Sequence, residues 1–257
     1  MTIAGSDSGG GAGIQADLKV IALLGGYGTS VITALTAQNT LGVQGIFPVP
    51  LAFIEKQLNS VLSDIDIDAI KTGMLGRAEV VSLIARKLKK RKVQKLVVDP
   101  IMISESGHRL MEKKAVPILK SDLFPMAGLI TPNLFEASIL AGLPVRTRAD
   151  MKKAARVIKE GTRGNVLIKG GHLSGTAIDL FFDGATFREF SRPRVRIRSP
   201  HGTGCTFSAA IATFWGQGLS LIEALEKAKE FITTAIAGSQ TIGHGKNATD
   251  PYAWFEK

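Results

Sequence analysis

The chain has 257 residues, of which 45% are hydrophobic, and a formal net charge of +10 at pH 7. Its length allows a sizeable core, and its charge favours an anionic partner such as nucleic acid, a membrane surface or a small phosphorylated ligand. Aromatic residues make up 6% and do not interleave with the basic cluster at 86–92, which argues against a nucleic-acid surface built on base stacking. No apolar stretch is long enough to span a bilayer, and the start resembles no signal peptide. We expect a soluble cytoplasmic protein with no nucleic-acid or membrane partner.

The cysteine and histidine content excludes two kinds of stabilising site. Cys205 is the only cysteine, so no intrachain disulfide can form. The four histidines, His108, His172, His201 and His244, are scattered without zinc-ligand spacing. We therefore expect no structural zinc.

Short β-branched runs alternate with longer helical patterns along the chain. We expect strands near 2–4, 30–36, 69–74, 95–101, 128–133 and 165–171, and helices near 14–25, 51–64, 78–90 and 149–161. This alternation is typical of a parallel sheet covered by helices on both faces. We find no linker and expect a single domain, 1–257.

The later part of the chain departs from this alternation once. Asp183 and Gly184 predict a two-residue hairpin turn within 177–190, and hence an antiparallel addition at one sheet edge. The following segment, RPRVRIRS, predicts an edge strand with Arg192, Arg194, Arg196 and Arg198 on one side, either as a solvated edge or as a ligand-binding face. A capping box at Ser220 and Glu223 predicts a closing helix that Gly238 ends.

Two glycine-rich turns open predicted helices. We call residues 4–18, AGSDSGGGAGIQADL, the first glycine-rich turn and residues 201–210, HGTGCTFSAA, the second. Such turns gather backbone N–H groups at the positive end of a helix dipole and so attract phosphate or another anion. The first turn matches neither a Walker A loop nor a dinucleotide-binding fingerprint.

The second turn places an ionisable side chain inside its candidate anion site. A helix N-terminus lowers the pKa of a thiol, so Cys205 could be partly thiolate near neutral pH and act as a base or a nucleophile. The alternative is that Cys205 is a small apolar residue packed in the first helical turn. His201 is interpreted as a turn residue.

Polar residues also follow four predicted strands. Asp99, Asn133, Glu136 and Lys169 stand at or just beyond the carboxyl ends, where open α/β sheets bind ligands. Two acids and an amide suit water-bridged magnesium, and a lysine suits a phosphate. The structural alternatives are a strand-end turn for Asp99, a helix cap built from Asn133 and Glu136, and a solvated Lys169.

Taken together, AGSDSGGGAGIQADLK, VITALTAQNT, KTGML, LVVDPIM, LITPNLFEA, LIKGGH and HGTGCTFSAAIA closely resemble the hydroxymethylpyrimidine/phosphomethylpyrimidine kinases of thiamine biosynthesis, in the ribokinase-like superfamily. The resemblance runs from about residue 1 to about residue 245. It implies a three-layer α/β/α domain that uses ATP and Mg²⁺ to phosphorylate 4-amino-5-hydroxymethyl-2-methylpyrimidine and then its monophosphate. It also implies a homodimer.

On the phosphate side, the resemblance assigns an anion hole to Gly202, Thr203 and Gly204 and a catalytic base to Cys205. It places Lys169 near the ATP phosphates. It assigns magnesium and its waters to Asp99 and Glu136, with Asn133 beside the nucleotide.

On the substrate side, the resemblance assigns pyrimidine recognition to Gln38, whose carboxamide offers an acceptor and a donor side by side. It places Gly5, Asp17 and Met74 around the same pocket, although Asp17 could instead serve the helix dipole. The segment GHGKNATDPYAWF departs from the family pattern, so no contacts are carried over to it.

Two other functions remain open at this stage. Some members of the family phosphorylate pyridoxal-type rings with the same GTGC turn, and only Gln38, which needs a 4-amino group, favours the pyrimidine. A basic binding protein without catalysis would show ligand binding without turnover and a steep salt dependence on nucleic acid.

Overall fold

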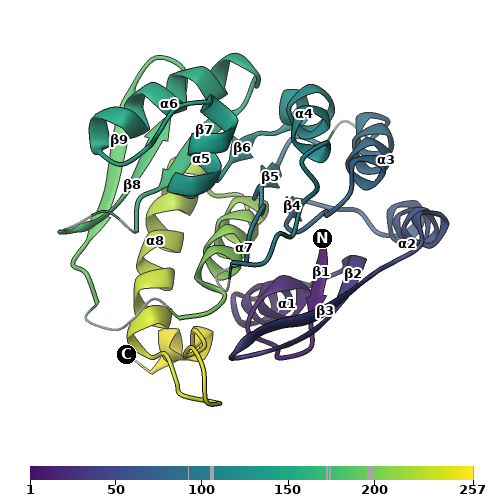
Figure 1. The fold of residues 1–257 in the computed structure, drawn as a ribbon, viewed down its shortest axis with the longest axis horizontal. Coiled ribbons are helices and arrows are strands. Elements are labelled where there is room, and N and C mark those ends of the chain that lie inside the picture. Colours follow the sequence, from purple (N-terminus) through teal and green to yellow (C-terminus); the bar gives the residue numbers. More distant parts are fainter. Residues whose placement is uncertain (92, 105–106, 172, 174, 196–199, 257) are drawn as a thin grey trace.

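The computed structural model describes residues 1–91, 93–104, 107–171, 173, 175–195 and 200–256. In this part of the chain, nine strands form one sheet in the order β3-β2-β1-β4-β5-β6-β7-β8-β9 (Figure 1). The strands are β1 (Thr2–Asp7), β2 (Ser30–Asn39), β3 (Gly42–Pro48), β4 (Ile70–Thr72), β5 (Leu96–Val98), β6 (Leu129–Ile130), β7 (Asn165–Lys169), β8 (Ala177–Phe182) and β9 (Phe187–Arg192).

The centre of the sheet is parallel and both of its edges are antiparallel. Strands β2, β1, β4, β5, β6 and β7 pair in parallel, whereas β3 pairs antiparallel with β2, and β8 and β9 continue antiparallel from β7. The expected mostly parallel sheet is confirmed. The expected antiparallel addition at one edge is also confirmed, by β8 and β9. The second antiparallel edge, β3, was not predicted, because its segment contains two glycines and gave no strand signal.

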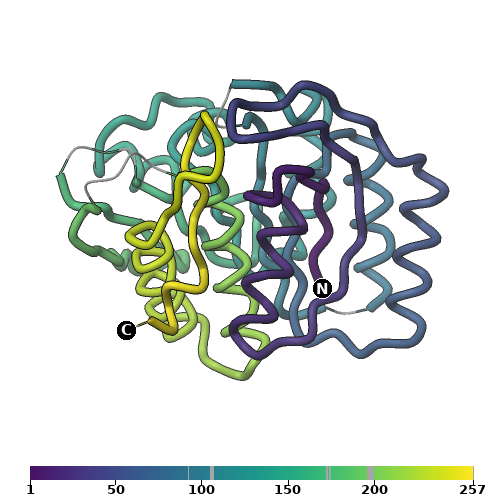
Figure 2. Tube along the Cα trace, turned by 90° about the horizontal axis from the view of Figure 1, so that it is seen from below, coloured from purple at the N-terminus to yellow at the C-terminus, as the bar shows by residue number. Residues whose placement is uncertain are grey.

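The helices form a layer on each face of the sheet (Figures 1 and 2). They are α1 (Gly13–Leu23), α2 (Leu51–Asp64), α3 (Ala78–Lys89), α4 (Ala115–Ile118), α5 (Leu134–Ala141), α6 (Arg148–Glu160), α7 (Thr203–Gly216) and α8 (Leu221–Ala237). A π-helical turn at Leu119–Leu123 and 3-10 turns at Phe124–Met126 and Pro251–Phe255 complete the helical segments that the structure describes.

Alternate residues of the central strands supply the two apolar cores. Leu96 and Val98 of β5 pack into the cluster shared with α2 to α6, whereas Val97 packs into the cluster shared with α1, α7 and α8. Successive side chains of a strand point to opposite faces, so an uninterrupted apolar run is buried on both sides. The three-layer α/β/α architecture is therefore as expected.

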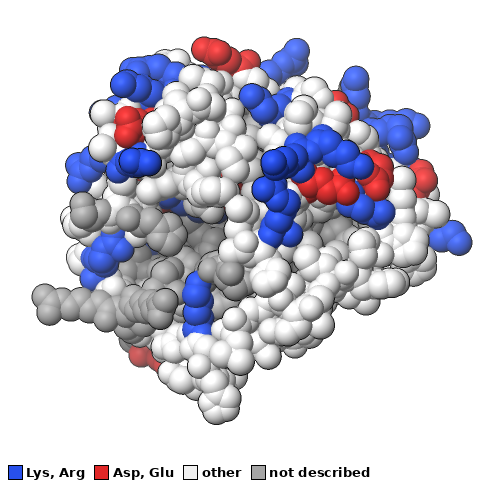
Figure 3. Space-filling model, viewed as in Figure 1, with Lys and Arg blue, Asp and Glu red and all other residues white. Residues whose placement is uncertain are grey.

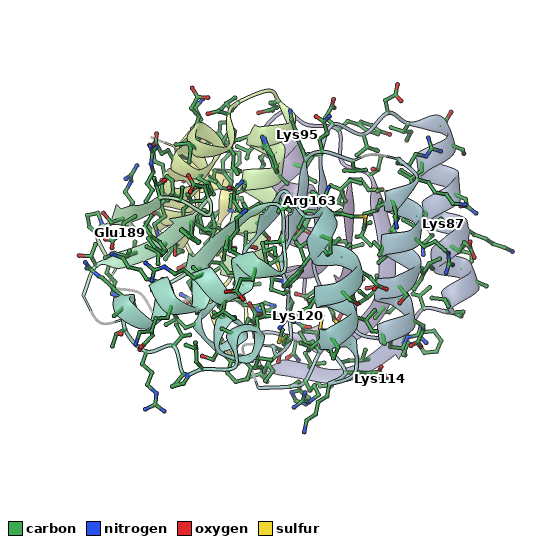
Figure 4. The ribbon with its side chains drawn as sticks, turned by 90° about the horizontal axis from the view of Figure 1, so that it is seen from above. Lys87, Lys95, Lys114, Lys120, Arg163 and Glu189 are labelled. Atoms are coloured by element: carbon green, nitrogen blue, oxygen red, sulfur yellow. The ribbon has the colours of Figure 1, made fainter. Side chains whose placement is uncertain are left out.

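Charged and capping residues fix several helix ends where the sequence predicts them. Ser220 and Glu223 form the capping box that starts α8, and Gly238 ends that helix. Basic residues occupy the last turn of α3, where they complement the helix dipole. One of them, Lys87, labelled in Figure 4, bonds to Glu55 of α2 at 2.6 Å.

Two expectations near β8 and β9 are wrong. The hairpin loop has four residues, Asp183–Thr186, because the Asp183 carboxylate accepts hydrogen bonds from the amides of Ala185 and Thr186 and so stabilises a wider turn. Strand β9 ends at Arg192, and 193–195 are not part of a strand, because Arg194 bonds instead to carbonyls such as Gly171 O at 2.8 Å. Arg196 and Arg198 lie outside the described residues.

The surface in Figure 3 carries Lys and Arg side chains over several elements rather than in one patch. In the part of the chain that the structure describes, no helix is both long and apolar enough to cross a bilayer.

Candidate active site

A cavity of about 290 Å³ lies at the carboxyl ends of the parallel strands. This is the edge at which open α/β sheets bind ligands. The structure brings most of the residues singled out in the sequence to its wall. They are Gly5, Gln38, Met74, Asp99, Asn133, Glu136, Lys169, Gly202, Thr203, Gly204 and Cys205. His201, interpreted as a turn residue, also lines the cavity.

The second glycine-rich turn presents free backbone amides to this cavity. Gly202 adopts a left-handed conformation with a φ of 84°, just before α7 begins. The first hydrogen bond of α7 runs from Thr206 N to Gly202 O at 2.9 Å, so the amides of 203–205 precede the helical ladder. None of these three amides donates to another described residue. An anion in the cavity could therefore accept from them.

The two glycine-rich turns touch each other at backbone level. A Cβ on Gly202 would lie 1.7 Å from Gly11 O, and a Cβ on Gly11 would lie 2.6 Å from His201 Cδ2. A side chain at Gly202 would force the turns apart and one at Gly11 would displace the His201 ring, so glycine at these two positions allows the turns to pack together.

Cys205 is buried in the first turn of α7. Burial raises the pKa of its thiol to about 11; the positive charge of Lys71 opposes this increase, while Asp17 and Asp99 add to it. Desolvation thus outweighs the favourable charges, which argues against the interpretation that Cys205 is partly thiolate near neutral pH.

Lys169 and Asp99, which both line the cavity, form an ion pair. Lys169 Nζ lies 2.7 Å from Asp99 Oδ1, and Ser208 of α7 donates to Asp99 Oδ2 at 3.0 Å. Burial by itself would lower the pKa of Lys169, but Asp99 and Glu136 raise it above its ordinary value, so the ammonium group persists. Lys169 is therefore not a solvated side chain, and Asp99 is held by more than a strand-end turn.

Asn133 and Glu136 adopt the helix-capping arrangement that the sequence allows. The Asn133 side chain accepts from Glu136 N, and Glu136 Oε2 accepts from Asn133 N at 2.8 Å. Burial raises the pKa of Glu136 to about 7; Lys169 lowers it and Asp99 raises it further. Glu136 thus starts α5 and also faces the cavity, so the structural and functional interpretations are compatible.

In the first glycine-rich turn, the anion bound by the backbone amides is a side chain of the protein itself, the carboxylate of Asp7. The Asp7 carboxylate accepts hydrogen bonds from Gly9 N at 2.8 Å, Gly11 N at 3.1 Å and Ala12 N at 2.8 Å. Burial by itself would raise the pKa of Asp7, but hydrogen bonds from His201 and from these amides hold it below its ordinary value. The expectation that this turn attracts a phosphate is therefore wrong, since its amides are already occupied.

Gln38 lies within hydrogen-bonding distance of His201 at the cavity wall. The Gln38 carboxamide nitrogen lies 2.8 Å from His201 Nε2, which lies 3.0 Å from Asp7 Oδ2. Asp7 was not among the residues predicted from the sequence, although an aspartate shortly before a run of glycines is a signal for a carboxylate bound by turn amides.

Asp17 does not line this cavity. It is fully buried and bonds to Lys71 Nζ at 2.8 Å and to Thr2 Oγ1 at 2.5 Å. It therefore ties α1 to β1 and β4, and it serves neither the pocket nor the first helical turn. The sequence signal for its partner was a lysine within an otherwise apolar strand.

Comparison with known proteins gives consistent relatives over nearly the whole chain. A family model described as phosphomethylpyrimidine kinase matches residues 7–250. The thiamine biosynthesis bifunctional protein ThiED of Geobacter sulfurreducens is 52% identical over 246 residues, which cover 95% of this chain and 50% of that protein. The chain spans about half the length of its bifunctional relatives.

Two further relatives match along their full length. The hydroxymethylpyrimidine/phosphomethylpyrimidine kinase of Rhizobium meliloti is 46% identical, with 96% of this chain and 94% of that protein covered. The solved ADP complex of Bacillus subtilis pyridoxal kinase superposes with a TM-score of 0.93 at 37% identity, and covers 100% of this chain and 98% of that one.

Proposed function

The chain belongs to the phosphomethylpyrimidine kinase family, and on this premise we propose that it transfers phosphoryl groups from ATP to 4-amino-5-hydroxymethyl-2-methylpyrimidine and then to the monophosphate so formed. The observation that carries the proposal is the composition of one cavity, in which Gln38 and Cys205 share the wall with the Lys169–Asp99 pair. Gln38 suits a pyrimidine, Cys205 an alcohol and Lys169 a phosphate.

The phosphate side of the cavity suits a transferring phosphoryl group. The amides of Thr203 and Gly204 donate to no other described residue and, with Gly202, belong to the turn that lines the cavity. Free amides at a helix N-terminus stabilise charge on phosphate oxygens. Lys169 supplies a fixed positive charge beside them: a Cβ on Gly204 would lie 3.4 Å from its Nζ. We assign these residues to the anion hole and to the ATP phosphates.

The oxygen donors in the cavity fit magnesium bound through water. Asp99 and Glu136 both line the cavity, with Asn133 beside them. Among the described residues, no three His, Cys, Asp or Glu side chains cluster to hold a metal. Magnesium commonly keeps several waters and uses one or two carboxylates plus substrate phosphates, which matches this donor set. Asp99 and Glu136 would hold the ion through its waters, and the charge it would supply there would offset that of the phosphates.

We assign to Cys205 the role of accepting the proton of the substrate alcohol. In the first step the hydroxymethyl oxygen bonds to the γ-phosphorus, its proton passes to the Cys205 sulfur, and ADP leaves. Burial raises the pKa of this thiol to about 11 even beside the positive charge of Lys71, so the proton acceptor is the small thiolate fraction present near neutral pH. In the second step the acceptor is a phosphate that already carries a negative oxygen, so it depends less on Cys205.

The substrate side of the cavity suits a flat heterocycle. Gln38 offers both hydrogen-bonding atoms of its carboxamide, and Met74 forms an apolar wall. A Cβ on Gly5 would lie 3.1 Å from the Met74 sulfur, so glycine there lets this wall approach closely. Asp17 has no part in this site.

Product analysis tests the function directly. After incubation with the pyrimidine and MgATP, we expect the monophosphate first and the diphosphate later, both resolved by chromatography. Absence of both products while the folded protein binds ATP would contradict the proposal.

A second candidate substrate follows from the solved relatives. The Bacillus subtilis structure with a TM-score of 0.93 is a pyridoxal kinase. Pyridoxal is also an aromatic nitrogen heterocycle with a hydroxymethyl arm, but it has no 4-amino group for Gln38. We expect ATP consumption with the pyrimidine to exceed that with pyridoxal, and the reverse preference would reassign the substrate.

We further propose, from the family, that the kinase acts in thiamine biosynthesis in the cytoplasm and that it forms a homodimer. Exposed apolar side chains on the β2–β3 edge, Leu35, Leu41 and Phe47, are compatible with a covered surface there. Sedimentation equilibrium would distinguish a dimer from a monomer.

A further inference from the structure

The Gln38 carboxamide is tied at both ends to groups with hydrogen bonds of their own. Its nitrogen lies 2.8 Å from His201 Nε2 and its oxygen 3.3 Å from Thr36 Oγ1. His201 Nε2 lies 3.0 Å from Asp7 Oδ2, and Thr36 Oγ1 donates to Ser6 O at 3.0 Å. Whether Thr36 or His201 donates a hydrogen bond to Gln38 or accepts one from it therefore depends on the other hydrogen bond that each of them makes.

At one end, Thr36 can only accept. A hydroxyl group has one proton, and the Ser6 carbonyl oxygen, which can only accept, is the nearer of its two partners, at 3.0 Å against 3.3 Å for Gln38, so the proton is directed to Ser6. The Thr36 oxygen retains lone pairs that face Gln38. This end therefore requires an N–H from the carboxamide.

At the other end, His201 can only donate. Asp7 is ionised, since its pKa lies below the ordinary value despite its burial, and its carboxylate can only accept. Nε2 of His201 must therefore carry a proton, and a protonated ring nitrogen cannot accept from an amide. With the proton on Nδ1 instead, the lone pair of Nε2 would face the carboxylate at 3.0 Å. This end requires the carboxamide oxygen.

Both requirements give the same direction of the carboxamide. A half-turn about its last bond exchanges oxygen and nitrogen in place, and hydrogen bonding alone distinguishes the two orientations. After that half-turn the single Nε2–H of His201 is shared between the Asp7 and Gln38 oxygens in a three-centre hydrogen bond, and Gln38 donates to Thr36. The backbone of His201 is held, because its amide donates to Asn247 O at 2.7 Å, and its ring packs on Gly11. The segment that contains Asn247 runs close to the β2–β3 hairpin in Figure 2, where Lys246 N donates to Thr40 O.

We propose that Asp7 and His201 fix the direction of the Gln38 carboxamide, with its oxygen toward the second glycine-rich turn and its nitrogen toward Thr36, and that His201 is thereby a positioning residue that selects an aminopyrimidine. This inference rests on the proposed function. His201 directly precedes Gly202, so the oxygen end of the carboxamide is the end that faces the anion site.

The chemistry of the ring explains the selection. In the aminopyrimidine, the 4-amino group lies between the hydroxymethyl arm and N3. With the arm at the second glycine-rich turn, the amine donates to the Gln38 oxygen and N3 accepts from the Gln38 nitrogen. The 4-oxo analogue carries a carbonyl and an N3–H in the same places, so acceptor meets acceptor and donor meets donor. Turning that ring over would restore the pairing but would direct the arm away from the anion site.

The test compares 4-amino-5-hydroxymethyl-2-methylpyrimidine with its 4-oxo analogue. We expect the wild type to favour the amine by at least a hundredfold in kcat/KM, since a site built to hydrogen-bond one edge strongly rejects the other. His201→Met removes the donor and lets the carboxamide turn, so the preference should fall by at least tenfold. His201→Gln, which retains an N–H near Nε2, should restore most of it.

Thr36 supplies a second and independent variant at the other end. Thr36→Val keeps the shape and removes the acceptor, and Thr36→Ser keeps both; only the valine variant should lower the preference. Equal loss of activity on both rings, with the ratio unchanged in His201→Met and in Thr36→Val, would show a purely structural role and overturn the proposal.

A binding measurement separates this inference from the proposed function. If the wild type phosphorylates neither ring, the proposed function fails, and the ratio of the two Kd values from calorimetry without ATP still reports the direction of the carboxamide. A ratio near one, or binding of neither ring, would overturn the inference as well.

Discussion

The two glycine-rich turns look alike in sequence but differ in what their amides hold. In the first, the Asp7 carboxylate accepts from three turn amides, so the chain supplies its own anion. In the second, the amides of 203–205 donate to no other described residue and line the cavity. A glycine-rich turn at a helix N-terminus is therefore an anion site only where no neighbouring carboxylate already occupies it.

Cys205→Ala should give the largest effect, because it removes the proton acceptor from the second turn. We expect the rate of the first phosphorylation to fall by about a thousandfold, within the range typical of general-base loss. The second phosphorylation should lose less, since its acceptor is already negative. Single-turnover rates of the two steps, measured separately, check this; an equal loss in both would remove Cys205 from the proton transfer.

Gly202→Ala should break the contact between the turns. The added Cβ would lie 1.7 Å from Gly11 O at a φ of 84°, so we expect the free energy of unfolding to fall by about 3 kcal/mol. Gly218→Ala is the matched control: its φ is 99°, but a Cβ there would meet nothing within 4 Å, so it should cost only about 1 kcal/mol. Urea unfolding of both variants measures the difference, and equal losses would mean that the turns tolerate separation.

Asp7→Ala should free the amides of the first glycine-rich turn, so that this turn becomes a site for an added anion, as we propose for the second. We expect a loss of about 2 kcal/mol in the free energy of unfolding, as for a hydrogen-bonded charge. Sulfate should then raise the Tm of the variant more than that of the wild type, because an added anion can replace the missing carboxylate. Identical sulfate responses would contradict the assignment of Asp7 as the anion of the first turn.

Gly204→Ala should weaken ligand binding and leave the fold intact. The added Cβ would lie 3.4 Å from Lys169 Nζ, an ordinary contact, but it would project into the space beside the proposed phosphate site. We expect the Kd for ATP to rise about tenfold, near the loss of one charge-assisted hydrogen bond, with an unchanged Tm. Gly161→Ala, whose Cβ would meet only Ile158 O at 3.6 Å, is the control and should change neither quantity.

The pH dependence of Cys205 alkylation measures the pKa of its thiol in the second glycine-rich turn. Because burial raises the pKa to about 11, the thiolate fraction increases as the pH rises toward that value. We expect the rate of alkylation by iodoacetamide to rise about tenfold per pH unit between pH 7 and 10, since the thiolate is the nucleophile. A plateau below pH 9 would show an acidified thiol, and Cys205→Ser provides the unlabelled control.

Periodicity was sufficient to predict the central sheet and the long helices. The expected helix at 51–64 coincides with α2, and those at 78–90 and 149–161 differ from α3 and α6 by one residue at most at each end. Periodicity failed for β3, in which glycines dilute the pattern. It also failed after Arg192, where alternation of arginine and apolar residues suggested a strand but the Arg194 side chain bonds to loop carbonyls instead. That 1–257 is a single domain stays a prediction.

Their positions at the ends of predicted strands were sufficient to predict that Asp99, Asn133, Glu136 and Lys169 line one cavity. Such positions could not show that burial would raise the pKa of Cys205, because desolvation depends on packing from distant parts of the chain. Nor could they place His201 against Asp7, since the two are 194 positions apart in the chain.

The Asp17–Lys71 pair has a consequence for how this protein can change over time. Both side chains are fully buried, and together they join α1 to β4. Loss of either one would leave an uncompensated charge in the core, at a cost of about 3 to 5 kcal/mol, whereas joint replacement by apolar residues need cost little. Positions 17 and 71 should therefore vary together among descendants of this chain, and the intermediate with one charge is the step that natural selection would remove.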